Sequence, residues 1–231
     1  MANTLDLEEQ EQLDELKHFW SKHGNWISWL LIVILGSLAA WNGYQWWQKN
    51  QGMQASAMFD EVEKVIKTGD SSKIDRAFSD MKERFPRAYT TQQVALSVAK
   101  NHYEAKKIEE SKAALKWLID SGTDSGLVSI ARLRMSAILV DAKAYDDALS
   151  VLATGVAQEF SALVADRRGD IYILQGKKSE ARTQYQNAYK AFGDQSDYRR
   201  LVTFKLNALG VNPTEESKDF KDSKEVKEAA K

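Results

Sequence analysis

Apolar and polar side chains divide the chain into an uncharged N-terminal stretch and a long C-terminal part with helical periodicity. Residues 24–47, GNWISWLLIVILGSLAAWNGYQWW, contain no Asp, Glu, Lys or Arg, and Lys22 and Lys49 flank them 27 positions apart. A helix of that length measures about 40 Å, and a bilayer core of about 30 Å needs ~20 residues. Tryptophans near both ends are typical of the membrane–water interfaces. The pattern predicts a transmembrane helix over residues 23–48.

A cleaved export signal is the main alternative for this stretch, and a buried helix of a soluble protein is the other. Residues 26–40 have the length of a signal's apolar region, and Ser37-Leu38-Ala39 resembles a cleavage site. The first 22 residues, however, contain six acidic side chains and only two lysines, which does not match a basic signal N-terminus. A soluble core helix would show polar positions at a 3.6-residue period, and this stretch lacks them. The lysines flanking the N-terminal side favour a cytoplasmic N-terminus.

Beyond the span, apolar residues recur at helical spacing, and no segment alternates with the period of a strand. The chain has only two prolines, and Gly, Pro and Asp mark most of the expected helix ends. The fold class predicted is therefore all-α. The expected helices cover residues 53–68, 73–84, 91–105, 109–119, 127–141, 145–158, 162–175, 178–192 and 198–209.

Helix pairs in this part repeat at a regular interval. The segment ADRRGDIYILQGKKSEARTQYQNAYKA, residues 165–191, closely resembles the tetratricopeptide pattern. It places a small residue at Gly169, an aromatic at Tyr172 and a turn at Gly176, followed by Ala181, Tyr185 and Ala188. In this pattern a small residue lets two helices approach, and an aromatic fills the adjacent gap. Three looser units precede it. The small-residue markers lie 34, 37 and 33 positions apart, close to a period of ~34, at Ala77, Ser111, Ala148 and Ala181. We expect a tetratricopeptide-like α-solenoid, with an unrelated helical bundle as the alternative.

Composition and motifs offer no sign of catalysis. Lys and Arg number 32 against 33 Asp and Glu, so the cationic excess of a nucleic-acid binder is missing. The absence of cysteine excludes disulfides, thiolate metal sites and cysteine nucleophiles. Of the three histidines, His18 and His23 flank the span and His102 falls at a helix-packing position. We expect no enzyme activity, no cofactor and no metal site.

The tetratricopeptide resemblance implies that the first helix of each unit lines a concave groove. Such a groove would suit an extended or helical segment of another protein. It is equally open that residues 198–209 or the N-terminal helices fill it. The residues expected to line the groove are Leu96, Lys100, Tyr103, Ile130, Leu133, Ala137, Val140, Leu163, Asp166, Asp170 and Ile173.

The whole layout resembles the YfgM family of ancillary SecYEG translocon subunits. The most specific parts are the lead-in to the span, which includes EQLDELKHFWSKHGNW at residues 11–26, and the unit from Gly169 to Ala188. The resemblance implies a single-pass protein of the bacterial inner membrane with its C-terminal domain in the periplasm. It also implies three partners: the SecYEG translocon, a PpiD-like membrane-anchored periplasmic chaperone, and exported polypeptides.

The functional hypothesis is a membrane-anchored interaction scaffold that assists periplasmic chaperones with exported proteins. Its expected parts are a cytoplasmic acidic segment (1–22), the span (23–48), a tetratricopeptide-like domain (49–212) and a charged flexible tail (213–231). One alternative is a regulator that tethers a cytoplasmic factor through its acidic N-terminal segment. Another is an organiser of the cell envelope or of a division complex.

Overall fold

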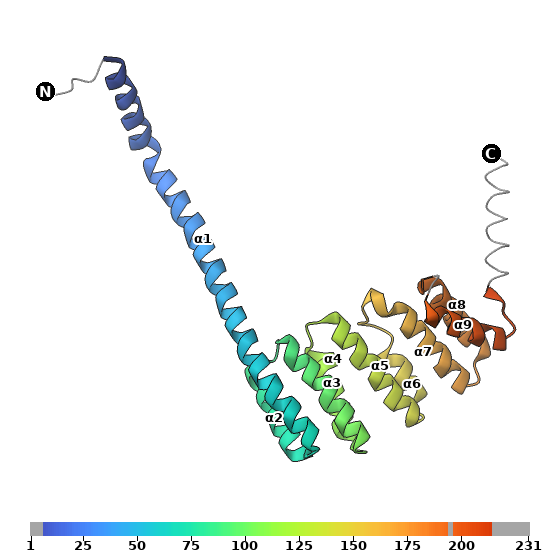
Figure 1. Cartoon of the computed structure of the whole chain (residues 1–231). Coiled ribbons are helices and arrows are strands. Elements are labelled where there is room, and N and C mark those ends of the chain that lie inside the picture. The colour runs from blue at the N-terminus through green and yellow to red at the C-terminus, as the bar shows by residue number, and fades with distance from the viewer. Residues whose placement is uncertain (1–6, 194–195, 214–231) are drawn as a thin grey trace, which may run out of the picture. The chain divides into compact units, whose positions relative to one another are not determined.

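The computed structural model describes residues 7–193 and 196–213, and all regular structure in these ranges is helical (Figure 1). The predicted all-α fold class is confirmed. The elements are α1 (Leu7–Thr68), α2 (Ser71–Arg84), α3 (Tyr89–Glu104), α4 (Ile108–Ser121), α5 (Ser125–Asp141), α6 (Tyr145–Val151), the 3₁₀ turn η1 (Gln158–Phe160), α7 (Ser161–Leu174), α8 (Lys178–Ala191) and α9 (Asp197–Ala208). The predicted charged tail, from residue 214 on, lies outside the described residues.

Helix α1 is longer than the sequence pattern predicts. We expected a new helix to begin at residue 53, but α1 continues from Leu7 to Thr68 without a break. No proline interrupts this stretch, and a single glycine, such as Gly52, is tolerated inside a helix at a cost of about 1 kcal/mol. The chain nevertheless forms two compact units, which divide between Gln54 and Ala55.

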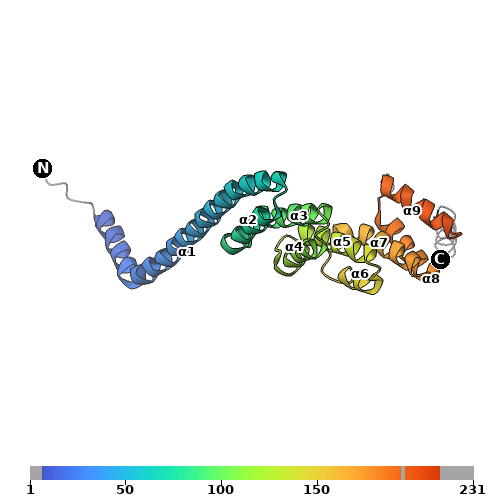
Figure 2. The ribbon, with the colours of Figure 1, turned by 90° about the horizontal axis from the view of Figure 1, so that it is seen from below.

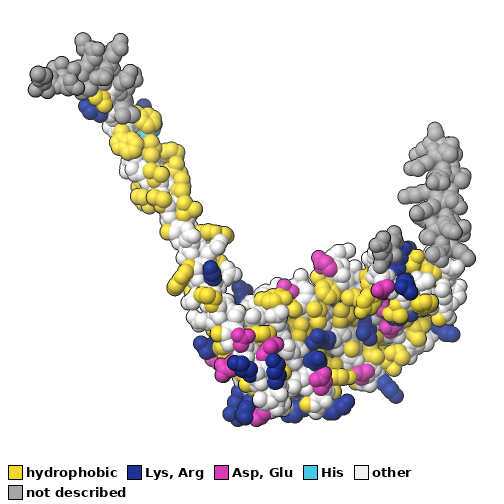
Figure 3. Space-filling view, in the orientation of Figure 1, with side chains coloured by type: hydrophobic (Ala, Val, Ile, Leu, Met, Phe, Trp, Pro, Cys, Tyr) yellow, Lys and Arg dark blue, Asp and Glu magenta, His cyan; other side chains and the backbone are white. Residues whose placement is uncertain are grey.

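In the first unit, the predicted span presents its apolar side chains without any protein cover. Trp26 and Trp46 are each 69% exposed, and the leucines and isoleucines from Leu30 to Leu38 are exposed as well. Apolar side chains dominate the surface of this helix (Figure 3). By length and composition, the part of α1 from Lys17 to Thr68 contains one helix able to cross a membrane. A buried soluble helix would be covered by protein, so this interpretation does not fit.

In the second unit, successive helices pair in an antiparallel array with two layers. Helices α3, α5 and α7 form one layer, and the second helices of each pair, α4, α6 and α8, lie on the other side (Figure 2). Each helix packs mainly on its neighbours in sequence. This is the arrangement of an α-solenoid, in which each repeat contacts only adjacent repeats.

Three apolar cores follow one another along the array. The first joins the end of α1 to α2, α3, α4 and α5, with Val62, Ile74 and Leu118 among its buried members. The second lies between α5, α6 and α7 around Leu152 and Ile171. The third joins α7, α8 and α9. Residues 55–84, the most degenerate unit by sequence, are therefore part of the solenoid core.

The turn inside each helix pair repeats the same backbone geometry. One residue per turn has φ between 60° and 76°, namely Gly69, Lys106, Lys143, Gly176 and Gly210. In the last four turns, the next residue after this one donates its N–H to a carbonyl five residues earlier in the chain. Examples are Lys107 N–H to His102 O at 2.8 Å and Lys177 N–H to Tyr172 O at 2.8 Å. This is the hydrogen bond of a Schellman-type helix end. This turn geometry recurs even where the residue at the left-handed position differs, since both glycine and lysine occupy it.

The small-residue markers lie on α2, α4, α6 and α8, as the repeat predicts. Ser111, Ala148 and Ala181 are buried, and the Ser111 hydroxyl donates to the Ala99 carbonyl of α3 at 2.7 Å. At Gly169, a Cβ atom would lie 2.3 Å from the Tyr185 ring. The close helix approach predicted at the small residue Gly169 is confirmed, and the aromatic that fills the gap is Tyr185.

One predicted helix is too long. The pattern extends a helix over residues 145–158, but α6 ends at Val151. Gly155 follows with φ of 70°, and a Cβ there would meet the Arg132 guanidinium at 2.8 Å. Arg132 also donates to the Val151 carbonyl at 3.0 Å. Arg132, which is distant in the sequence, thus binds the C-terminal end of α6, at a point where local periodicity predicts that the helix continues.

Candidate functional site

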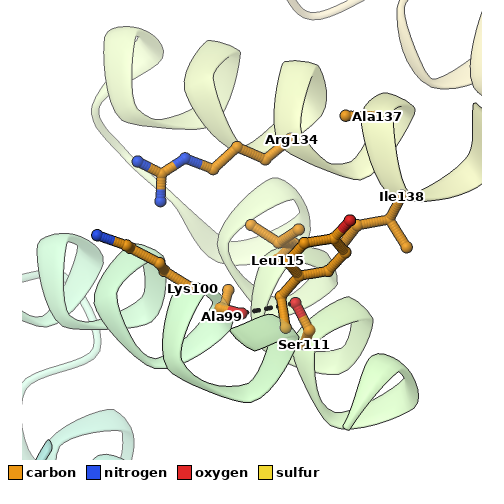
Figure 4. A pocket seen from close by; sticks show the side chains of 8 residues that line it. Ala99, Lys100, Ser111, Leu115, Arg134, Ala137 and Ile138 are labelled. Atoms are coloured by element: carbon orange, nitrogen blue, oxygen red, sulfur yellow. Dashed lines mark hydrogen bonds between the residues drawn. The ribbon is translucent and has the colours of Figure 1, made fainter. Parts of the chain in front are cut away.

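A pocket of about 350 Å³ opens between α3 and α5 of the repeat domain, with α4 beneath it. Three residues expected to line the groove, Lys100, Tyr103 and Ala137, lie at its wall (Figure 4). The other lining residues are Ala99, Ser111, Leu115, Arg134 and Ile138. The volume lies at the lower end of the range for ligand pockets, ~300–1,000 Å³, so it can take an apolar side chain.

Small residues and two hydrogen bonds keep the pocket open. Ala99 on α3 and Ala137 on α5 both line the pocket, where larger side chains would fill the space. Ser111 is bonded to the Ala99 carbonyl, which fixes α4 against α3. The Arg134 guanidinium donates from Nη1 to the Leu96 carbonyl at 2.9 Å, which joins α5 to α3. These two hydrogen bonds therefore hold the helices that line the pocket, α3, α4 and α5, in place.

The pocket is polar at its edges and apolar within. The Tyr103 hydroxyl donates to Asp141 Oδ2 at 2.6 Å, and this hydrogen bond to the carboxylate raises the pKa of Tyr103. Lys100 and Arg134 extend from α3 and α5 to the same side of the pocket, away from Ile138 (Figure 4). The floor between them includes Leu115, which is buried.

Four expected groove residues contribute to the cores instead. Leu96 is buried in the first core and Ile130 packs against it. Leu133 and Val140 pack against the second core, between α5 and α7. Helical periodicity places these residues on roughly the correct side of α3 and α5, but a shift of one residue turns a side chain by about 100°. That shift is enough to separate the groove wall from the core.

At the α7 end, the expected acidic residues are already paired. Lys205 Nζ of α9 lies 2.7 Å from both Asp166 Oδ1 and Asp170 Oδ1, and the Tyr185 hydroxyl donates to Asp170 Oδ1 at 2.8 Å. Burial raises the pKa of Asp166, and the Lys205 ammonium opposes that shift. Helix α9 thus contacts α7 here through a charged side chain.

The two remaining expected residues, Leu163 and Ile173, are also on α7. Leu163 is half-buried and Ile173 is exposed. The structure therefore brings Lys100, Tyr103 and Ala137 together at one pocket and places the α7 residues elsewhere on the array. Near Asp166 and Asp170, Lys205 of the 198–209 segment contacts the expected groove residues. Between α3 and α5, an open pocket remains.

Sequence reasoning missed Arg134 and Lys205. Arg134 is adjacent to Leu133 and three residues before Ala137, so a helical wheel anchored on Ala137 would have included it. No local signal predicts that Lys205 reaches α7, since the partner carboxylates are 35 and 39 residues away. The packing role expected for His102 agrees with its burial and with its Nε2 atom, 2.8 Å from Asp75 Oδ1. No group of metal-ligating side chains occurs among the described residues.

Comparison with known proteins fits this architecture. A profile of the tetratricopeptide repeat-like domain matches residues 17–211. The chain is 31% identical over 204 residues to a Neisseria gonorrhoeae protein named ancillary SecYEG translocon subunit, with 88% of this chain and 98% of the relative covered. Proteins of the same name from Haemophilus influenzae and Escherichia coli are 28% and 24% identical, over 88% of this chain and 98% and 97% of their own lengths. The chain therefore belongs to the tetratricopeptide repeat-like family of ancillary SecYEG translocon subunits.

Proposed function

We propose that this protein is a single-pass scaffold of the bacterial inner membrane that works at the SecYEG translocon. The names of its relatives support the association with the translocon, and the uncovered apolar side chains of α1 support membrane anchoring. Lys17 and Lys22 on the N-terminal flank favour a cytoplasmic N-terminus. The repeat domain then faces the periplasm, where exported chains emerge.

In this proposal the pocket between α3 and α5 binds segments of other polypeptides. The observation that supports this proposal is the apolar pocket with polar edges. It lies on the helices that line the groove in tetratricopeptide domains. Its occupants are segments of exported polypeptides or of a PpiD-like membrane-anchored chaperone. Apolar contact and hydrogen bonding give reversible association without any covalent step.

The anchor explains how weak contacts at such a pocket can suffice. A domain held at the membrane meets its partners at a high effective concentration, so that binding becomes close to intramolecular. A pocket on one array of helices can then take up and release successive segments. The protein thereby assists chaperones at the channel exit by holding chains or partners in place.

The test is co-purification from native membranes with the full-length protein. We expect translocon subunits and a periplasmic chaperone or exported chains to accompany the wild type. Ala137→Phe, which fills the pocket, should reduce the chaperone or exported chains while the translocon remains. Ala113→Phe is the matched control, because Ala113 is exposed on α4 in the opposite layer.

Two outcomes would contradict the proposal. If no translocon subunit accompanies the wild-type protein, the assignment to the translocon fails. If translocon subunits are present but Ala137→Phe changes no partner, the pocket is not where polypeptides bind. Deletion of residues 2–16 adds a third arm: loss of all partners on that deletion would favour the regulator acting through its acidic N-terminal segment.

A further inference from the structure

We propose that the pocket between α3 and α5 selects an apolar side chain that has a carboxylate beside it in the bound segment. This inference rests on the proposed function, since it assumes that the pocket binds polypeptide, and it adds which polypeptides bind best. The partner is therefore an extended segment in which a residue such as Leu stands next to Asp or Glu.

The first argument is the charge of the pocket wall. Lys100 and Arg134 are its two charged lining residues, and both are cations. Both side chains extend to the same end of the opening (Figure 4). A carboxylate at that end would meet an ammonium and a guanidinium together, and the guanidinium fork matches a carboxylate geometrically.

The existing contacts of these cations leave them able to bind an anion. Lys100 Nζ lies 3.8 Å from Glu104 Oε1, with both side chains more than 60% exposed, and such a pair contributes little. Arg134 donates to the Leu96 carbonyl through Nη1, and the guanidinium carries five N–H groups in all. The hydrogen bond to Leu96 holds the Arg134 side chain in place, which lowers the entropy lost when it binds an anion.

The opposite edge of the pocket fixes the direction of the segment. The Tyr103 hydroxyl donates its hydrogen bond to Asp141. This edge therefore presents the lone pairs of the hydroxyl oxygen, with the Asp141 carboxylate next to it. An acidic group would be repelled there and attracted at the Lys100–Arg134 edge. The apolar side chain then lies over Leu115, between the two edges.

At the α7 end of the expected groove, the charges do not offer the same site. Near α7, the carboxylates of Asp166 and Asp170 both contact the Lys205 ammonium, which is only 24% exposed. That stretch therefore presents paired charges, and its lysine is held by two anions. The preference for an acidic neighbour belongs to the α3–α5 pocket.

The experiment compares two fluorescein-labelled peptides, Gly-Ser-Thr-Leu-Asp-Thr-Ser-Gly and the same peptide with Asn in place of Asp. Their binding to the full-length protein in detergent micelles is measured by fluorescence anisotropy at low and high salt. For the wild type, we expect the Asp peptide to bind about fivefold more tightly at low salt, as for two exposed charge pairs. This advantage should shrink as salt screens the charges.

Two double variants test which cations are responsible. Lys100→Gln with Arg134→Gln should remove the advantage, so that the Asp and Asn peptides bind this variant with equal affinity. Lys116→Gln with Arg200→Gln, two exposed cations outside the pocket, should keep the advantage. Lys100→Gln alone serves if loss of the Arg134 hydrogen bond unfolds the domain, and it should remove about half of the advantage on a logarithmic scale.

The outcomes separate this inference from the proposed function. If both peptides bind the wild type equally, or if the advantage is undiminished in the Lys100→Gln variants, the acidic preference is wrong and the peptide-binding groove stands. If neither peptide binds at millimolar concentration, while Ala137→Phe also leaves every co-purifying partner unchanged, the groove itself is wrong. If neither binds but Ala137→Phe removes a partner, the acidic preference alone is overturned.

Discussion

At Gly169, the backbone of α7 approaches the Tyr185 ring of α8 so closely that no side chain fits between them. Tyr185 is buried and its hydroxyl is bonded to Asp170, so the ring cannot move aside freely. Sequence alone could predict a close helix approach at Gly169, because a small residue occupies that place in the repeat, but it did not show that Tyr185 is the aromatic in contact. It could not identify Lys205, since nothing local links α9 to Asp166 and Asp170.

Replacing Gly169 by Ala should destabilise the repeat domain. The added methyl would overlap the Tyr185 ring, and overpacking costs roughly 1–3 kcal/mol, against a gain of about 1 kcal/mol in helix propensity. We expect the free energy of unfolding to fall by about 1 kcal/mol in urea titration. Gly52→Ala is the control, because a Cβ there meets nothing within 4 Å. Equal or higher stability for Gly169→Ala would contradict the close-approach account.

The Tyr185 hydroxyl gives the domain a pH dependence in the alkaline range. Burial and then the hydrogen bond to Asp170 raise the pKa of Tyr185 well above its ordinary value. The folded state therefore keeps this proton above pH ~10, where an unfolded chain loses it, so the stabilisation is present below pH ~10 and declines as the pH rises further.

Tyr185→Phe should accordingly lower the free energy of unfolding by about 1 kcal/mol at pH 7, through loss of one hydrogen bond. Above pH 10 the difference between Tyr185→Phe and wild type should become smaller. The measurement is urea unfolding of both proteins at pH 7 and pH 10.5. A difference that stays constant or grows between these pH values would show that the hydroxyl does not titrate as described.

At the scale of the elements, the turns share a left-handed backbone conformation even where the residue at that position differs. Gly69, Gly176 and Gly210 occupy three of the left-handed positions, and lysines occupy the other two. A sequence search for glycine therefore detects only part of the repeat. The predicted helices differ from the observed ones mainly at two places: α1 continues through the predicted break before residue 53, and α6 ends early where Arg132 contacts its C-terminal end.

Lys143→Gly should stabilise the domain. Lys143 has φ of 60°, and a side chain in that conformation costs roughly 1–2 kcal/mol, part of which glycine loses again through its freer unfolded state. We expect a net gain of about 0.5–1 kcal/mol in the free energy of unfolding. Ala113→Gly, inside α4, should instead lose about 1 kcal/mol. If Lys143→Gly loses as much as Ala113→Gly, the left-handed turn is not a strained position.

For the whole molecule, the absence of cysteine allows the proposed topology to be tested directly. Asp14→Cys and Lys116→Cys each introduce a single thiol at an exposed position on either side of the predicted span. In intact spheroplasts, a membrane-impermeant maleimide should label Lys116→Cys and should label Asp14→Cys only after lysis. The reverse pattern would place the repeat domain in the cytoplasm, and labelling of both thiols before lysis would contradict a single membrane span.

The predictability of the molecule from its sequence differs between its parts. The uncharged stretch is long enough that composition alone identifies a helix able to cross a membrane, and small residues at a ~34-residue period identify the solenoid. The open pocket is harder, because it depends on which of Leu133, Arg134 and Ala137 turns toward α3. That choice is made by packing against α6 and α7 and by the Arg134 hydrogen bond to Leu96.

The most direct test of the central claim is site-specific photo-crosslinking in native membranes from a probe at Tyr103. Tyr103 lies at the pocket wall and is partly exposed, and a probe at Lys116 in the opposite layer is the matched control. The account predicts adducts with translocon-proximal partners, a periplasmic chaperone or exported chains, from position 103 and not from position 116. Equal adducts from both positions, or adducts only from a probe near the acidic N-terminus, would contradict a polypeptide-binding groove.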